Sequence, residues 1–166
     1  MPSTLAHYIA EEQGNGLERG KGTNAARCGV SELMRKHSQV GALPVRLNKN
    51  GNPEILLVTT RGGQRWMIPK GYRAKRLGDA RAAAREAFQE AGVKGDVHRR
   101  PIGDFTDRNG NGESNTIRVF RLDVRKEHAH WREERERSRK WVSPAKAKKL
   151  LQAAGLKKLI DLVLRG

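Results

Sequence analysis

The chain has 166 residues, a length that suits one domain with one hydrophobic core, and 36% of its residues are hydrophobic. Its 34 Lys and Arg against 18 Asp and Glu give a net charge of +16, which favours polyanionic partners such as phosphates or nucleic acid. The single cysteine, Cys28, excludes an intrachain disulfide and a cysteine-based zinc site. No apolar run reaches membrane-spanning length and no signal-peptide core is present, so no membrane partner and a cytoplasmic location are expected.

Residues 1–36 are expected to form a poorly ordered tail. They are rich in Gly, Asn, Glu and Ala, with GNGLERGKGTN in the middle, a composition that provides little apolar surface to bury. Five Lys or Arg and four Glu fall within residues 1–40, so almost all of the positive excess belongs to the rest of the chain. The sequence therefore predicts one basic folded domain over residues 37–166.

Two strand-like segments, VGALPVRL at 40–47 and EILLVTT at 54–60, begin this domain. The dipeptide Asn50-Gly51 between them is a turn signal, so the pair is predicted to form a β-hairpin. RWMIP at 65–69 is a further short apolar run.

A loop rich in Gly, Arg and Lys then leads into ARAAAREAFQEAGV, residues 80–93, which has the spacing of a helix. Asp79 suits the positive end of the helix dipole, and Gly92 suits the position just after the last turn. One side of the helix is nearly all alanine, which allows close packing against whatever lies beneath it. These residues are Ala80, Ala83, Ala84, Ala87 and Ala91.

Glu86, Gln89 and Glu90 lie on a different face of the same helix, because spacings of three and four bring side chains together. Two carboxylates one turn apart repel each other, and they offer oxygen ligands to a hard divalent cation such as Mg²⁺. A solvated acidic face is the other interpretation, and the Glu-x-x-x-Glu spacing alone favours it.

The remaining segments alternate between strand and helix signals, which indicates a mixed sheet with helices packed on it. Ser143 is predicted to cap a C-terminal helix that has Pro144 at its first position. The apolar stripe of that helix comprises Leu150, Leu151, Ala154, Leu159, Leu162 and Val163. Before it come a weak strand over 96–105, a loop over 107–115, a strand over 116–124 and a charged connection over 126–140.

The segment from Gly71 to Val93 resembles the Nudix box, G-x5-E-x7-R-E-U-x-E-E-x-G-U, where U is an aliphatic residue. The matches at the correct spacing are Gly71, Arg85, Glu86, Glu90, Gly92 and Val93. The flanking phrases EILLVTTRGGQRWMIPKG and RKWVSPAKAKKLL are also similar to Nudix sequences, and the resemblance covers about residues 38–154. It implies an α/β/α sandwich with a mixed β-sheet and hydrolysis of a pyrophosphate bond. The diphosphoinositol-polyphosphate and diadenosine-polyphosphate branch is the most similar.

The chain departs from the box at two positions. Leu77 stands at the first box glutamate, and Gln89 stands before the last one, where the branch usually has its catalytic base. A glutamine can offer a carbonyl oxygen to a metal but cannot accept a proton at neutral pH. We therefore expect weaker metal binding than is normal for the family, with Mg²⁺ arriving mostly with the substrate phosphates.

The resemblance also implies which residues form the site. Metal ligands are expected at Glu86, Glu90 and the backbone carbonyl of Lys70, with Mg²⁺ as the cofactor and Mn²⁺ as an alternative. The catalytic positions are Arg85, Glu86 and Gln89, and Arg85 would orient a glutamate. Substrate contacts are expected at Thr59, Thr60, Arg61 and Arg139, and the loop before the helix is itself crowded with Lys and Arg.

Nudix enzymes often recruit a catalytic carboxylate from outside the box, and the candidates here are Glu113, Glu133 and Glu134. The expected function is a Mg²⁺-dependent hydrolase of a phosphorylated small molecule: a nucleoside diphosphate derivative, a dinucleoside polyphosphate or an inositol pyrophosphate. Ser38 and Gln39 replace the basic residues that the branch has before its first strand, which weakens the case for an inositol pyrophosphate as substrate. The alternatives are a catalytically weak module that binds RNA or polyphosphate, and removal of pyrophosphate from RNA 5′ ends. Both RNA interpretations rank lower because no RNA-binding signature is present.

Overall fold

A computed structural model describes residues 39–108 and 112–165 of the chain. The predicted tail over 1–36 lies outside the described residues. Within the described part, no helix has both the length and the apolar character that crossing a membrane requires.

The centre of the fold is a mixed sheet, as predicted. Its central path runs β3-β2-β1-β7-β5, with β4 paired to β1, β6 to β7 and β8 to β2. The strands are β1 (Gln39–Leu47), β2 (Pro53–Thr59), β3 (Trp66–Met67), β4 (Lys70–Tyr72), β5 (Val93–Val97), β6 (Gly103–Arg108), β7 (Ser114–Glu127) and β8 (Arg139–Val142). β1 pairs with β7 in parallel, and the other pairings are antiparallel. The predicted hairpin is confirmed by the antiparallel pairing of β1 with β2.

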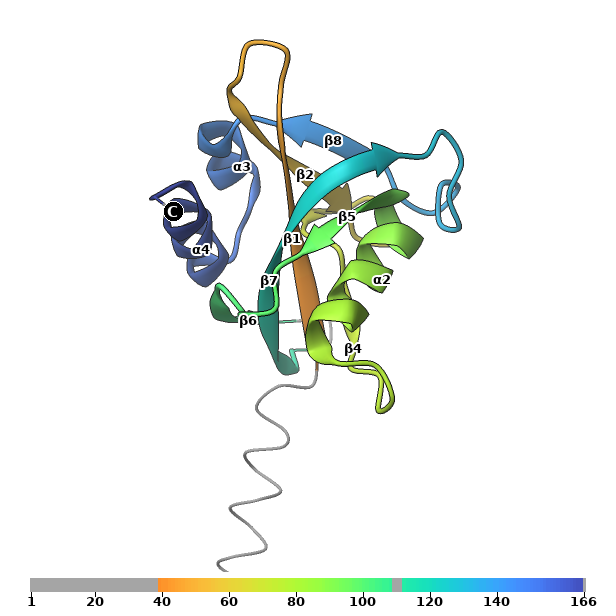
Figure 1. The fold of residues 1–166 in the computed structure, drawn as a ribbon. Coiled ribbons are helices and arrows are strands. Elements are labelled where there is room, and N and C mark those ends of the chain that lie inside the picture. The colour runs from red at the N-terminus through yellow and green to blue at the C-terminus, as the bar shows by residue number, and fades with distance from the viewer. Residues whose placement is uncertain (1–38, 109–111, 166) are drawn as a thin grey trace, which may run out of the picture.

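Helices cover both faces of this sheet. Helix α2 (Asp79–Ala91) lies on one face, and α3 (Pro144–Leu150) and α4 (Ala154–Arg165) lie on the other (Figure 1). The molecule is therefore the α/β/α sandwich expected from the sequence.

The residues of β2 show why both faces need a cover. Ile55 and Leu57 belong to the core cluster beneath α3 and α4, whereas Leu56 and Val58 belong to the cluster beneath α2. Successive side chains of a strand point to opposite faces, so an unbroken apolar strand such as ILLV becomes stable only between two layers.

The alanine face of α2 packs directly on the sheet. Ala83, Ala87 and Ala91 are fully buried, and the helix ends at Gly92, whose φ of 64° lies in the left-handed region. A Cβ at Gly92 would also collide with Trp131, so the residue is required both by the turn and by the close approach of the following loop. This close packing fixes the height at which Glu86 and Glu90 stand above the sheet.

Two expected elements differ in the structure. The strand predicted over 96–105 is divided into β5 and β6, with residues 98–102 between them. The C-terminal helix is two helices, because Leu151 is extended and ends α3. Ser143 does cap α3, accepting a hydrogen bond from the Lys146 amide at 3.3 Å. Leu162, predicted in the apolar stripe, is 53% exposed.

Candidate active site

Most of the predicted site residues line one cavity of about 600 Å³, at the junction of β4, α2 and the loop before β8. The members that the sequence predicted are Thr60, Arg61, Lys70, Arg85, Glu86, Gln89 and Glu90. Further cations lie in the same cavity, at Arg73, Arg132 and Arg137. Positive charge therefore surrounds the acidic face of α2, an arrangement that suits an anionic ligand bound beside a carboxylate pair.

Glu86 stands against the box glycine. A side chain at Gly71 would collide with the Glu86 carboxylate, so a larger residue here would displace that carboxylate. Arg85 donates a hydrogen bond from Nη2 to Oε1 of Glu86 at 2.9 Å. The neighbouring Arg85 thus fixes the carboxylate in its place through a charge-assisted hydrogen bond.

Glu90 is more deeply enclosed, with 7% of its side chain exposed. The backbone N–H of Lys70 donates to Oε2 at 3.1 Å, and Nη2 of Arg137 lies 2.6 Å from Oε1. Burial raises the pKa of Glu90 to about 7, although the Arg137 charge and the Lys70 amide both favour the carboxylate. Glu90 therefore changes charge within the physiological pH range.

Of the three candidate carboxylates outside the box, Glu133 lines the cavity. Glu133 is buried in the cavity wall, where Arg137 contacts it at 2.6 Å and Arg61 at 3.1 Å. Burial alone would raise the pKa of Glu133, but the hydrogen bonds and charges of Arg137 and Arg61 outweigh it and lower the pKa below its ordinary value. Glu134 is exposed and bonded to His130, and neither it nor Glu113 lines the cavity.

The two departures from the box have different surroundings. Gln89 lines the cavity, and its backbone carbonyl accepts a hydrogen bond from the Glu133 amide at 3.2 Å. Leu77 packs against the core cluster beneath α2 and does not line this cavity. Only the replacement at Gln89 therefore changes the chemistry of the cavity.

Two predicted substrate contacts lie outside the cavity. Arg139 donates to the carbonyls of Ala91 at 2.6 Å and His128 at 2.8 Å, so it holds the end of α2 against the following loop. Thr59 is buried, and its hydroxyl accepts a hydrogen bond from the Ser138 amide at 3.0 Å. Arg137, two residues before Arg139, instead reaches the cavity and contacts both Glu90 and Glu133.

Sequence reasoning missed a further buried carboxylate near the cavity. Asp107 is 6% exposed and accepts two hydrogen bonds from Arg65, at 2.9 and 3.0 Å. The ammonium group of Lys70 lies 3.8 Å from Asp107 and donates to Gln39 at 3.3 Å. Burial lowers the pKa of Lys70, and the negative charges of Asp107 and Glu90 partly offset that shift. Asp107 falls in a segment predicted as a loop, where no periodicity marked it for burial.

The donors in the cavity have the hard oxygen character that Mg²⁺ prefers. Glu86, Glu90 and Lys70 line the same cavity, and their oxygen donors fit a divalent cation. Within residues 39–108 and 112–165, however, no three His, Cys, Asp or Glu side chains are grouped to hold a metal ion. A bound cation would therefore draw its remaining ligands from the backbone, water and substrate phosphates.

The family model described as the NUDIX domain matches residues 35–163 of the chain. Nudix hydrolase 13, mitochondrial, from Arabidopsis thaliana is 26% identical over 145 residues, which cover 75% of this chain and 72% of the relative. Nudix hydrolase 21, chloroplastic, from the same plant is 30% identical over 129 residues, which cover 74% of this chain and 63% of the relative.

Solved structures share the fold. An Ap4A hydrolase from C. elegans aligns with a TM-score of 0.56 and 21% identity, over 76% of this chain and 95% of that one. The Nudix hydrolase RenU from M. smegmatis aligns with a TM-score of 0.54 and 20% identity, over 78% of this chain and 84% of that one. The chain belongs to the Nudix family. It is a Nudix-type hydrolase, built on the mixed α/β fold of these structures.

The raised pKa of Glu90 predicts how stability depends on pH when no metal is present. The folded protein holds this proton more tightly than the unfolded chain does. Glu90 therefore stabilises the fold fully below its ordinary pKa of 4.5, and this contribution is lost as pH rises through about 7. The measurement is urea unfolding with a chelator at about pH 5 and about pH 8. From the lower to the higher pH, the free energy of unfolding of the wild type should fall by about 1 to 3 kcal/mol more than that of Glu90→Gln. Parallel pH profiles for the two proteins would contradict the shift.

Proposed function

We propose that this protein hydrolyses a pyrophosphate bond in a polyphosphate-linked nucleotide, with Mg²⁺ as its cofactor and Mn²⁺ as an alternative. The observation that carries the proposal is the pair Glu86 and Glu90, which share one cavity with six cations. Those cations are Arg61, Lys70, Arg73, Arg85, Arg132 and Arg137. A cavity with this charge pattern can accept a chain of phosphoryl groups and still present carboxylates to a cation.

Glu86, Glu90 and the backbone carbonyl of Lys70 are the groups that would hold the cation. When bound, a divalent cation neutralises phosphoryl oxygens and lowers the pKa of bound water. Arg85 keeps Glu86 oriented through the 2.9 Å hydrogen bond. Arg137 must share Glu90 with the cation or release it, because their present separation is only 2.6 Å.

Glu133 is the residue we propose to take the place of the missing box carboxylate. Its lowered pKa keeps it ionised at neutral pH, so it can accept a hydrogen bond from the attacking water and then the proton. In support of this role, the backbone N–H of Glu133 donates a hydrogen bond to the backbone carbonyl of Gln89 at 3.2 Å, and Gln89 stands where the branch usually has its catalytic base. Arg61 and Arg137 would hold both this carboxylate and the phosphoryl oxygens nearby.

The substrate we propose is a dinucleoside polyphosphate. The net charge of +16 favours a chain of several phosphates over a single diphosphate link. The structural likeness to an Ap4A hydrolase agrees with this choice, although at 21% identity it speaks for the fold alone. An inositol pyrophosphate has less support, because Gln39, at a position where the branch has a basic residue, lines the cavity with an uncharged amide. This amide accepts a hydrogen bond from Lys70.

One observation favours a second candidate, a module that binds polyanions with little turnover. Arg85 and Arg137 already pair with the two carboxylates, and Gln89 cannot act as a base. Such a module would bind RNA or polyphosphate through the same cations. It would release little phosphate or pyrophosphate from any substrate with Mg²⁺ or Mn²⁺.

A substrate panel tests the proposal. Pure protein with Mg²⁺ or Mn²⁺ should turn over tetra- and pentaphosphate-linked dinucleotides with a higher kcat/KM than a nucleotide sugar, and substrate binding should weaken steeply as salt rises. Phosphate and pyrophosphate release are the measurements, and inositol pyrophosphates and RNA with a 5′ triphosphate complete the panel. Equal turnover of the nucleotide sugar and the long dinucleotides, without a salt effect, would contradict the substrate class.

A further inference from the structure

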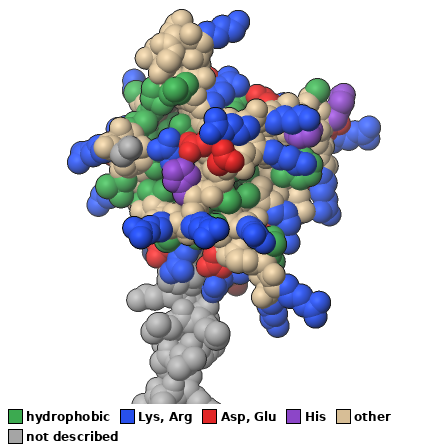
Figure 2. Space-filling model, viewed as in Figure 1, with side chains coloured by type: hydrophobic (Ala, Val, Ile, Leu, Met, Phe, Trp, Pro, Cys, Tyr) green, Lys and Arg blue, Asp and Glu red, His purple; other side chains and the backbone are tan. Residues whose placement is uncertain are grey.

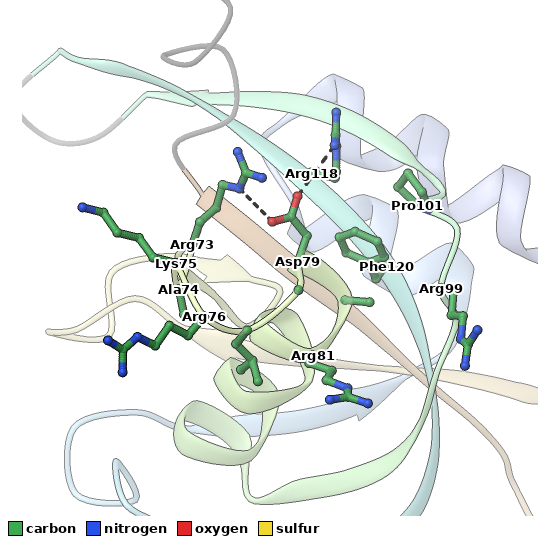
Figure 3. Close-up of a pocket in the computed structure, with 13 residues that line it drawn as sticks. Arg73, Ala74, Lys75, Arg76, Asp79, Arg81, Arg99, Pro101, Arg118 and Phe120 are labelled. Atoms are coloured by element: carbon green, nitrogen blue, oxygen red, sulfur yellow. Dashed lines mark hydrogen bonds and ion pairs between the residues drawn. The ribbon is translucent and has the colours of Figure 1, made fainter.

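A second, larger cavity of about 890 Å³ lies at the start of α2. Its walls are the loop that connects β4 to α2, the segment between β5 and β6, and strand β7 (Figure 3). Arg73 is the only lining residue that this cavity shares with the candidate active site. The two cavities are therefore separate spaces that meet at one side chain.

Charge distinguishes this cavity from an ordinary surface depression. Among its lining residues are six cations, Arg73, Lys75, Arg76, Arg81, Arg99 and Arg118, and the only carboxylate is Asp79. Four of the cations, Lys75, Arg76, Arg81 and Arg99, form no ion pair with any carboxylate of the described residues. In Figure 2, Lys and Arg side chains cover the tip of the loop that precedes α2. Holding this much unneutralised charge together disfavours the fold through repulsion, and a bound anion would relieve it.

The one carboxylate is itself neutralised. Asp79 lies 2.7 Å from Arg73 and 3.7 Å from Arg118, and Figure 3 shows it between these two side chains. It therefore repels an incoming anion weakly, and it holds two arginines from different elements in fixed positions. Arg118 also pairs with Asp104 at 3.4 Å.

The floor of the cavity is apolar and belongs to the core. Phe120 on β7 is 3% exposed and belongs to the core cluster beneath α2, and Leu77 packs on the same cluster. Ion pairs over such a floor are less screened than ion pairs in open water. The first turn of α2 forms part of the wall and adds the positive end of its dipole, although the side chains carry most of the charge.

From this geometry we propose that the cavity is a second binding site for phosphate-rich anions. Five of its six cations are arginines, whose forked donors match the geometry of phosphate oxygens. Such an anion has two sources: the far end of a long substrate that passes Arg73 on its way out of the active site, or a separate inorganic polyphosphate. The first source rests on the proposed function, whereas the second does not.

Inorganic tripolyphosphate is the probe, used without a divalent metal so that no hydrolysis is needed. The test variant is Arg76→Gln with Arg99→Gln, which removes one exposed cation from each side of the cavity and none from the active site. The matched control is Lys49→Gln with Lys158→Gln, which removes the same charge from the β1–β2 turn and from α4. Calorimetry should show tripolyphosphate binding at least about tenfold weaker in the test variant than in wild type or control.

Amide NMR shifts caused by tripolyphosphate provide an independent measurement, and they should include residues 73–81, 99 and 100. Affinity in the test variant equal to that of the control, or shifts confined to the active site, would overturn the proposal. If the test variant loses binding to a short single-stranded RNA but binds tripolyphosphate as the wild type does, the result would overturn the proposal in favour of an RNA site.

Steady-state kinetics then distinguish the two sources. If the test variant has a raised KM for a pentaphosphate-linked dinucleotide and an unchanged KM for a nucleotide sugar, the bound anion is the far end of the substrate. Unchanged KM values combined with lost tripolyphosphate binding identify a separate anion. If the protein hydrolyses nothing but still binds tripolyphosphate through Arg76 and Arg99, the proposed function fails and this site remains.

Discussion

Replacing Glu86 or Glu90 with Gln should lower the turnover of a polyphosphate-linked dinucleotide by at least about 100-fold. Both side chains share the cavity with Lys70, and an amide keeps the size of the carboxylate but loses its charge and most of its affinity for a divalent cation. The melting temperature should not fall. The raised pKa of Glu90 shows that burial disfavours its charge, and a Gln at this position can still accept the hydrogen bond from the Lys70 amide.

Turnover at saturating metal and thermal unfolding are the measurements for these variants. Glu134→Gln is the matched control, because it removes one carboxylate from the loop before β8 without changing the cavity. It should retain wild-type turnover. Full activity in Glu86→Gln or Glu90→Gln would remove that residue from the metal site, and a large fall in melting temperature would indicate a structural role instead.

Glu133→Gln should lower kcat by about 100-fold with little change in KM, if Glu133 accepts the proton of the attacking water. The converse variant, Gln89→Glu, should leave the rate nearly unchanged or reduce it, because a fourth carboxylate would join Glu86, Glu90 and Glu133 in one cavity. A large rate gain in Gln89→Glu at saturating Mg²⁺ would show that the reaction lacks a base and that Glu133 does not supply one.

The ion pairs of Glu133 need their own control. Glu136 also contacts Arg61, at 2.9 Å, but does not line the cavity, so Glu136→Gln removes a similar charge contact without replacing a residue of the cavity. Arg61→Gln breaks the 3.1 Å pair and keeps the Glu133 carboxylate. A role in proton transfer predicts a changed pH–rate profile in Glu133→Gln alone. A purely structural role predicts that Arg61→Gln loses as much kcat as Glu133→Gln does.

The sequence determined those features that depend on neighbouring residues. The apolar run in β2, the turn at Asn50-Gly51 and the helical spacing of the alanines are all local patterns, and each produced the predicted element. The acidic face of α2 is local in the same sense, because spacings of three and four fix which side chains share a side of a helix. The box spacing then identified the family from a short segment, before any contact between distant segments was known.

Only the tertiary structure decided what surrounds that face. Glu133 and Arg137 lie more than forty positions after Glu90, in a charged connection without periodicity, and no local rule distinguishes Glu133 from Glu134. The path of the loop before β8 brings Arg137 to the carboxylates and turns Arg139 toward the end of α2. The cationic cavity is decided in the same way, since Arg76, Arg99 and Arg118 meet only when three separate segments pack together. Electrostatic interactions depend on distance in space, and a sequence specifies that distance only through the fold.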